Sequence, residues 1–126
     1  MKKIIRTLNA PKAVGTYSQG VIFNNLIFTS GQIAIDPTSG ELIKNNFKLE
    51  IQQVLSNIDA ILNEGGSSLD LVIKLNVYIT SMNNFSQLND IFNNFFNTDP
   101  PARSVVEVTS LPMGAQIKID AIGIVN

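Results

Sequence analysis

PPARSVVEVTSLPMGAQIKIDAI, at residues 100–122, predicts two strands joined by a reverse connection at Leu111–Gly114. Arg103, one of only two arginines, lies at the start of the first strand, directly after a proline pair. Lys118 and Asp120 share one face of the second strand, because side chains two residues apart point to the same side. An arginine fixed at a strand entrance suits a small carboxylate, since its planar fork offers two parallel charge-assisted hydrogen bonds. We expect the rest of the chain to be a scaffold that presents this arginine.

The bulk composition excludes several classes of function. With 126 residues, we expect a single domain over residues 1–126. The net charge is −1 and the charges are scattered singly, so no basic stripe predicts nucleic-acid binding. The absence of cysteine and histidine excludes disulfides, thiolate zinc sites, cysteine nucleophiles and Ser-His triads.

The N-terminal sequence MKKIIRTLNAPKA carries two lysines but no long apolar region behind them, unlike a secretory signal. No apolar run approaches the ~20 residues that span a bilayer. We therefore expect a cytoplasmic protein with no membrane partner.

The N-terminal part of the chain predicts a short edge strand and a β-hairpin. The edge strand begins at Ile4. Val21–Phe23 and Leu26–Phe28 are two β-rich triplets that flank Asn24 and Asn25. Asparagine tolerates the positive φ angles of a type I′ turn, so this pattern predicts a tight hairpin.

Two apolar stripes of helical period predict the helices. The first helix runs from a cap at Asn45 or Asn46 to Gly65–Gly66, and the second from about Asn84 to Asn97. We assign to the core the stripe of the first helix: Phe47, Ile51, Val54, Leu55, Ile58, Ile61 and Leu62. Between the helices, an alternation of period two predicts a half-buried strand with one face formed by Leu71, Ile73, Leu75, Val77 and Ile79.

With the last strands at residues 104–108 and 117–124, the order is ββ-α-β-α-ββ. This order predicts an α+β domain with two helices packed on one face of a mixed β-sheet. The strands also carry apolar residues on the other face, for example Val72 and Ile122. A second copy of the chain is the economical cover for that face, so we predict a homo-oligomer.

Three candidate site residues have ordinary alternatives. Tyr17 lies in a loop between glycines, and the residues alone favour an ordinary surface or half-buried tyrosine. Gly31 either lets backbone N–H groups approach a ligand or forms an ordinary turn or bulge. Arg103 shares a strand face with Val105 and Glu107, so a salt bridge to Glu107 is the alternative to a ligand. Surface pairs of that kind contribute only ~0–1 kcal/mol, which makes stability a weak reason for this arginine.

A series of short motifs occurs along nearly the whole chain without a gap. They are Gly15-x-Tyr17-Ser18-Gln19-Gly20, Thr29-Ser30-Gly31-Gln32, Asn89 with Phe92, Phe95 and Phe96, Pro101-Ala102-Arg103-Ser104, Val106-Glu107-Val108, Leu111-Pro112 and Ile117-x-Ile119-x-Ala121-Ile122. Together these motifs resemble the Rid (YjgF) family of reactive-intermediate deaminases.

The resemblance implies a homotrimer of a chorismate-mutase-like α+β fold, with clefts between neighbouring subunits. It implies hydrolysis of 2-aminoacrylate and related enamines or imines to a 2-keto acid and ammonia, with no metal or organic cofactor. The partner would thus be a small 2-imino or 2-keto carboxylate. Arg103 would hold its carboxylate with help from the backbone N–H of Gly31, and the carbonyl of Val105 would meet the imine nitrogen. The remaining cleft residues implied are Tyr17, Ser30 and Asn89.

The implied chemistry agrees with a chain that lacks histidine and cysteine. An iminium carbon is already electrophilic, so the site needs no nucleophile of its own. Orientation of the substrate and a water molecule can supply much of the rate enhancement.

Three positions depart from the family pattern. Thr16 stands where proline is usual, and Val105 replaces a common cysteine. Lys118 stands where the family typically has a glutamate thought to position the attacking water. A lysine there attracts a carboxylate but repels an iminium cation, by a few kcal/mol at ~4 Å. Asp120, on the same strand face, is a candidate to replace the glutamate; alternatively, Lys118 points outward into solvent.

The sequence therefore supports two functions. The first is an imine deaminase, slowed or altered in substrate by Lys118. The second is a non-catalytic trimer whose Arg103 and Lys118 clefts bind a 2-keto acid or another small anion for sensing or regulation. Ribonuclease activity or translation inhibition finds little support in an acidic chain without histidine.

Overall fold

Three strands precede the first helix in the computed structural model, which describes residues 1–126. The elements in chain order are β1 (Lys3–Ile5), β2 (Gly20–Phe23), β3 (Leu26–Thr29), α1 (Phe47–Glu64), β4 (Val72–Ile79), α2 (Phe85–Phe95), β5 (Ala102–Glu107) and β6 (Ile117–Ile124). The edge strand predicted to begin at Ile4 is confirmed as β1, which pairs with β2. The predicted order ββ-α-β-α-ββ left this strand out and so was one strand short.

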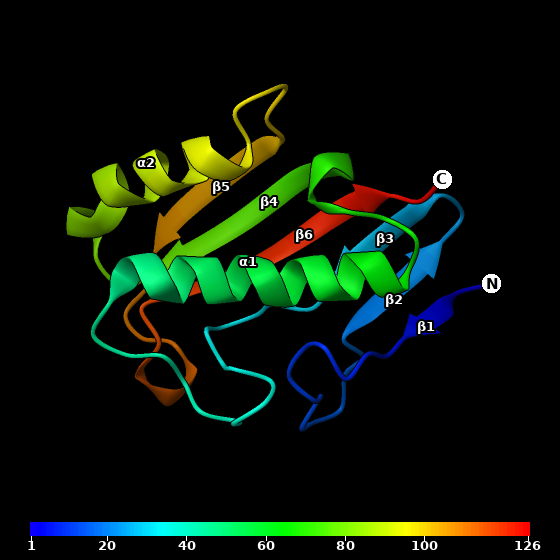
Figure 1. Cartoon of the computed structure of the whole chain (residues 1–126), viewed down its shortest axis with the longest axis horizontal. Coiled ribbons are helices and arrows are strands. Elements are labelled where there is room, and N and C mark those ends of the chain that lie inside the picture. Colours follow the sequence, from blue (N-terminus) through cyan, green and yellow to red (C-terminus); the bar gives the residue numbers. More distant parts are fainter.

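All six strands form one mixed sheet with the order β1-β2-β3-β6-β4-β5. Only β4 and β5 are parallel, since α2 connects them as a crossover. Both helices lie on the same face of the sheet, with α1 crossing its middle and α2 covering β4 and β5 (Figure 1). The predicted α+β architecture is confirmed. Neither helix combines the length and the hydropathy that a bilayer crossing requires.

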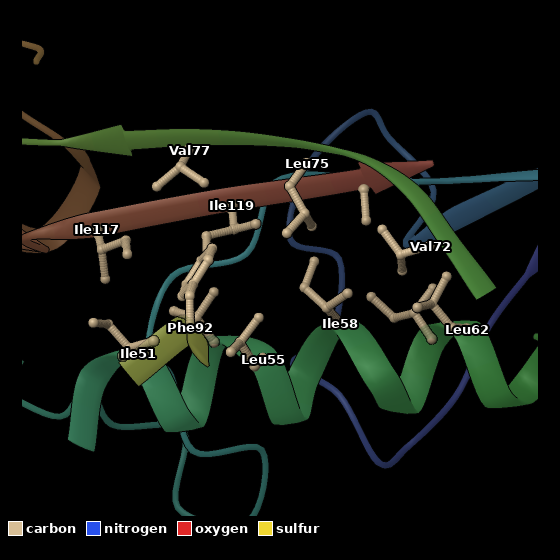
Figure 2. Close-up of a cluster of buried hydrophobic side chains, with 14 of the residues drawn as sticks. Ile51, Leu55, Ile58, Leu62, Val72, Leu75, Val77, Phe92, Ile117 and Ile119 are labelled. Carbon is tan, nitrogen blue, oxygen red and sulfur yellow. The ribbon is translucent and has the colours of Figure 1, made fainter. Parts of the chain in front are cut away.

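The core lies between α1 and the central strands. Ile51, Leu55, Ile58 and Leu62 point from α1 toward β4 and β6 (Figure 2), and all four are fully buried. Burying one such side chain contributes about 1.5–3 kcal/mol, so this stripe fixes the helix on the sheet. The side chain of Asn46 caps α1 by accepting a hydrogen bond from the backbone N–H of Leu49, as predicted.

The predicted hairpin is confirmed, because Phe23 pairs with Leu26 across Asn24 and Asn25. Two local details were wrong. The hairpin turn has positive φ at Asn24 but not at Asn25, so it is not a type I′ turn. In β4, the register against β6 shifts after Val72. This bulge inserts one residue and reverses the faces at the strand's start, because side chains alternate with period two. Val72 is therefore buried in the core at 6% exposure, and Ile73 is exposed at 42%.

The opposite face of the sheet carries no helix (Figure 1). It is apolar in large part: Phe28, Ile73 and Val106 are exposed there, and Ile122 is half-buried. We call this surface the open face. It has the character of a subunit interface. The homo-oligomer remains a prediction that this face supports.

Candidate functional site

The predicted site residues lie in two groups on opposite faces of the sheet. Arg103 is the register partner of Leu75, which is fully buried beneath the helices. Lys118 is the register partner of Tyr78, between the core residues of β6, and so belongs to the open face. Side-by-side residues of neighbouring strands point to the same face. The sheet therefore separates Arg103 from Lys118 within one protomer.

The first group, which we call the Arg103 half-site, comprises Asn89, Arg103 and Val105 together with Phe85 and Phe92. The guanidinium carbon of Arg103 lies 5.8 Å from the ring centroid of Phe85 and 5.6 Å from that of Phe92. Phe85, Asn89 and Phe92 follow one another at helical spacing and share a face of α2. Cation–π contacts of this kind contribute about 0.5–1 kcal/mol each at exposed sites. They restrict the direction in which the arginine fork can point.

The alternative partner of Arg103 is engaged elsewhere. A carboxylate oxygen of Glu107 accepts a hydrogen bond from the backbone N–H of Met82, at 2.8 Å. The side chain of Arg103 stays exposed beside its two phenyl rings. Asn89 is half-buried. Val105 is half-buried on edge strand β5, whose outer backbone edge is not paired within the sheet.

The second group, the Lys118 half-site, forms a pocket of about 540 Å³. Tyr17, Ser30, Gly31 and Lys118 line it, as do Lys12, Val14, Pro112 and Met113. The loops that follow β1, β3 and β5 supply most of these residues and gather at one end of the molecule, below α1 in Figure 1. The structure thus brings four predicted site residues together in one pocket. Tyr17 is half exposed on its wall, so it is at once a surface tyrosine and a pocket residue.

The side chain of Lys118 lies across Gly31. A methyl group built on Gly31 would overlap the Cε atom of Lys118 and approach its Cδ and Cγ atoms at 3.3 Å. Gly31 therefore permits a close approach, and the group that approaches in the protomer is this lysine. The half-buried Lys118 lines the pocket, contrary to the alternative of an outward solvated lysine.

Asp120 is not among the residues that line this pocket. Its carboxylate accepts a hydrogen bond from the side-chain amide of Asn76 on β4, at 2.8 Å. It shares the open face with Lys118, one strand repeat away, as the alternation predicted. The structure does not bring it to the pocket, and its role as a replacement for glutamate remains a hypothesis.

Comparison with known proteins assigns the chain to a family. The family model described as Endoribonuclease L-PSP matches residues 7–125. A RutC family protein of Pyrococcus horikoshii is 47% identical over 97% of both chains. The chain belongs to the Rid (YjgF) family.

Two further relatives of this Rid protein carry functional names. A bovine protein named 2-iminobutanoate/2-iminopropanoate deaminase is 39% identical over 98% of this chain and 90% of the relative. A Lactococcus lactis protein named as a candidate regulator, AldR, is 44% identical over 95% of both. Among solved structures, the Rid protein YyfA of Yersinia pestis superposes with a TM-score of 0.96 at 46% identity, covering 99% and 100% of the two chains. TdcF of Escherichia coli, solved with bound serine, gives 0.93 at 37%, covering 98% and 99%.

Sequence reasoning missed the side chain that holds the N-terminal loop of this Rid protein. Gln19 is buried, and its amide donates to the carbonyls of Thr7 and Pro11 at 3.0 and 2.8 Å. Its carbonyl oxygen accepts from the N–H of Thr7 at 2.7 Å. Gln19 therefore fixes the loop that carries Lys12 and borders Tyr17. Its position in a family motif was the only signal available in the sequence.

Two buried polar residues of α1 hold other loops of the pocket. Asn57 is fully buried and donates to the carbonyls of Ile33 and Ile35 at 3.3 and 2.9 Å. Glu50 accepts from the side-chain amide of Gln116 at 2.6 Å, beside the loop that carries Met113. We assigned only core packing to the α1 stripe, yet Glu50 and Asn57 follow its helical spacing. A polar residue on an apolar stripe was the signal for these anchors.

No group of three histidine, cysteine, aspartate or glutamate side chains lies close enough to hold a metal ion. The polar chemistry of the candidate site comes from Arg103, two lysines, the hydroxyls of Tyr17 and Ser30, and backbone groups.

Proposed function

We propose that this Rid protein is a cytoplasmic imine deaminase that hydrolyses small 2-imino acids, such as those derived from 2-aminoacrylate, to 2-keto acids and ammonia. The observation that carries the proposal is the division of the site into two incomplete halves. The Arg103 half-site offers an exposed carboxylate-binding fork, and the Lys118 half-site offers a pocket with hydroxyl groups but no arginine. Similarity to relatives named as deaminases, at 37–39% identity, supports this reaction class.

A homotrimer would complete the site. The two half-sites lie on opposite faces of one sheet, so a single protomer cannot close them around one small molecule. Contact between the open face of one subunit and its neighbour would bury Phe28, Val106 and Ile122 and set Arg103 of one subunit against the Lys118 half-site of the next. Each trimer would then contain three equivalent clefts.

In this cleft the fork of Arg103 binds the substrate carboxylate through two parallel hydrogen bonds. The backbone N–H of Gly31 adds a third, and the carbonyl of Val105 accepts from the imine N–H. Water attacks C2, the carbon–nitrogen bond breaks, and the nitrogen leaves as ammonia after receiving a proton, which yields the 2-keto acid. Asn89 supports the cleft wall next to Arg103.

The hydroxyls of Tyr17 and Ser30 orient the water. Ser30 already donates its proton to the carbonyl of Ser18, so its oxygen lone pairs are available to accept a hydrogen bond from that water. Lys118, as an ammonium group, adds positive charge to the cleft but accepts no proton from water. We therefore expect slower turnover than in a relative with glutamate at this position, with Asp120 as the candidate proton acceptor.

The deaminase assay tests this proposal. 2-Iminopropanoate is generated in place by an amino-acid oxidase, and residual imine is trapped with semicarbazide. Wild type should accelerate imine loss, and Arg103→Ala should abolish the acceleration. Arg103→Lys, which keeps the charge but not the fork, should retain only a small part of it. Wild-type protein that leaves the imine decay unchanged would refute the deaminase proposal.

A second candidate function is a non-catalytic trimer that binds a 2-keto acid for sensing or regulation. Lys118 favours it, since a lysine cannot perform the task of a glutamate, and the similarity to AldR adds support. The variant Lys118→Glu separates the two functions. An inert wild type, combined with an active Lys118→Glu variant, would assign this chain to binding alone.

A further inference from the structure

The Lys118 half-site carries an excess of positive charge. Lys12 and Lys118 both line the pocket, and no aspartate or glutamate is among its twelve lining residues. The nearest acid along β6, Asp120, is hydrogen-bonded to Asn76 instead. Arg103 of the next subunit would add a third cation to the same cleft.

A monocarboxylate neutralises only one of these charges. If Arg103 takes that carboxylate, as in the proposed function, both lysines remain unpaired across a small cleft. Two unpaired ammonium groups in one cleft repel each other. A ligand with a second acid group removes that repulsion and adds charge-assisted hydrogen bonds.

We propose that the cleft selects 2-imino or 2-keto dicarboxylates, with the 2-carboxylate on Arg103 and the distal carboxylate on Lys118 and Lys12. The inference rests on the proposed function in assigning the first carboxylate to Arg103 and in setting that arginine against the Lys118 half-site of the neighbouring subunit. The two lysines would contact the distal carboxylate with different degrees of order. Lys118 is half-buried with its alkyl chain against Gly31, whereas Lys12 is exposed. Lys118 is therefore the more ordered of the two contacts.

The pocket has room for the longer ligand. Its volume of about 540 Å³ on the protomer alone is within the range of small-molecule sites. The hydroxyl of Tyr17 lies on the same pocket wall and can donate to the distal carboxylate. The class of reaction that must supply such a substrate is oxidation of an acidic 2-amino acid, or elimination from one that carries a leaving group on its β-carbon.

The test measures binding by calorimetry at low ionic strength, with 2-oxoglutarate as the dicarboxylate and 2-oxobutanoate as the monocarboxylate. Wild type should bind the dicarboxylate at least ~10-fold more tightly. Lys118→Gln should reduce that preference about ten-fold, and Lys12→Gln less, because an exposed charge pair contributes less. Lys48→Gln, on the exposed side of α1, is the matched control and should leave the preference unchanged.

Arg103→Ala separates this inference from the proposed function, because it should weaken binding of both keto acids. Equal affinity of wild type for the two acids would overturn the inference, as would a preference that survives Lys118→Gln or an absence of binding to either acid. Imine turnover is measured separately. Suppose the protein prefers the dicarboxylate through Lys118 but hydrolyses no imine. This result would support the inferred ligand specificity and refute the proposed deaminase activity.

Discussion

The two half-sites are built in different ways. The Arg103 half-site consists of neighbouring regular elements, α2 and β5, and its arginine is held by two aromatic rings of the helix. The Lys118 half-site takes only Lys118 from a strand, and loops supply its other walls. The Arg103 half-site, which would bind the 2-carboxylate shared by all these substrates, is thus built on regular elements. The part that would adapt to the rest of the ligand depends on how its loops are held.

The loops of the Lys118 half-site are held by hydrogen bonds from a few buried side chains. Gln19, Glu50 and Asn57 are each nearly or fully buried and bind backbone or side-chain groups of loop residues. The partners of Glu50 and Asn57 are distant in sequence, whereas those of Gln19 belong to the loop that precedes it. No buried side-chain polar atom of the structure lacks a hydrogen-bond partner. Removing one of these side chains would leave loop groups without a hydrogen-bond partner. The Arg103 half-site, by contrast, does not depend on one buried polar side chain to hold its backbone. The comparison therefore predicts that the two half-sites can be broken independently.

The largest effect should come from mixing two variants, each broken in one half-site. Arg103→Ala removes the carboxylate fork, and Gly31→Val fills the pocket where Lys118 lies. Each variant alone should be inactive. In trimers reassembled from an equal mixture, about a quarter of the clefts would combine two intact half-sites, so activity should return to about that fraction of wild type.

The control for this experiment is the same mixture without subunit exchange. Activity should then stay absent, because each trimer carries only one kind of subunit. A mixture that stays inactive after verified exchange would contradict a site shared between subunits.

A smaller effect is expected from Asn57→Leu, which keeps the side-chain volume but removes the anchor of the segment from Ile33 to Ile35. The carbonyl of Ile35 loses its donor, and that of Ile33 keeps only the backbone N–H of Ile35, so unfolding free energy should fall by about 1–3 kcal/mol. Hydrogen exchange should accelerate at the backbone amides of Ile35 and Asp36 and stay unchanged in α2 and β5. Asn63→Leu, at an exposed position of the same helix, is the control and should change stability by less than about 0.5 kcal/mol. Equal acceleration in both half-sites would show that they are not independent.

The same contrast explains what the sequence could predict. Regular elements carry a periodic pattern, so the α1 stripe, the β2–β3 hairpin and both last strands could be located in advance. The bulge after Val72 left no trace in the alternation, because an apolar residue occupies each of positions 71–73. The alternation also could not show that Arg103 and Lys118 lie on opposite faces. That fact depends on strand order and on register between β4, β5 and β6, which are set by contacts distant in sequence.

The candidate site shows a similar limit. Family motifs pointed to Tyr17, Ser30, Gly31 and Lys118, and the structure groups these four in one pocket. The motifs gave no indication that the side chain of Lys118 would lie over Gly31. A side chain's contacts in a loop-lined pocket depend on several chain segments at once, and a motif describes only one of them.

Within the Arg103 half-site, Phe85→Leu should weaken carboxylate binding without affecting the pocket. It removes one of two cation–π contacts, so a 2-keto acid should bind about 2- to 5-fold more weakly, the equivalent of ~0.5–1 kcal/mol. The measurement is calorimetric titration at constant ionic strength. Phe95→Leu is the matched control, because Phe95 is half-buried on the same helix and packs on the core and on Phe96. If Phe85→Leu and Phe95→Leu bind the 2-keto acid with the same affinity, the ring of Phe85 does not position Arg103.

The smallest effect concerns backbone strain, which also differs between the half-sites. No residue of α2 or β5 has positive φ, whereas Met113, on the wall of the Lys118 half-site, has φ +61° and ψ +15°. A left-handed conformation costs most residues about 1–2 kcal/mol, and asparagine less. Met113→Asn should therefore raise stability by about 0.5–1 kcal/mol, measured as a rise in Tm at fixed protomer concentration. Met82→Asn, at another exposed methionine with ordinary φ, should not.

Strain persists at binding sites when it positions a group. A Met113→Asn variant that gains stability and loses affinity for the keto acid would therefore mean that the strained loop holds the pocket open. A variant that gains stability with unchanged affinity would mean that the buried anchors alone set the pocket's shape.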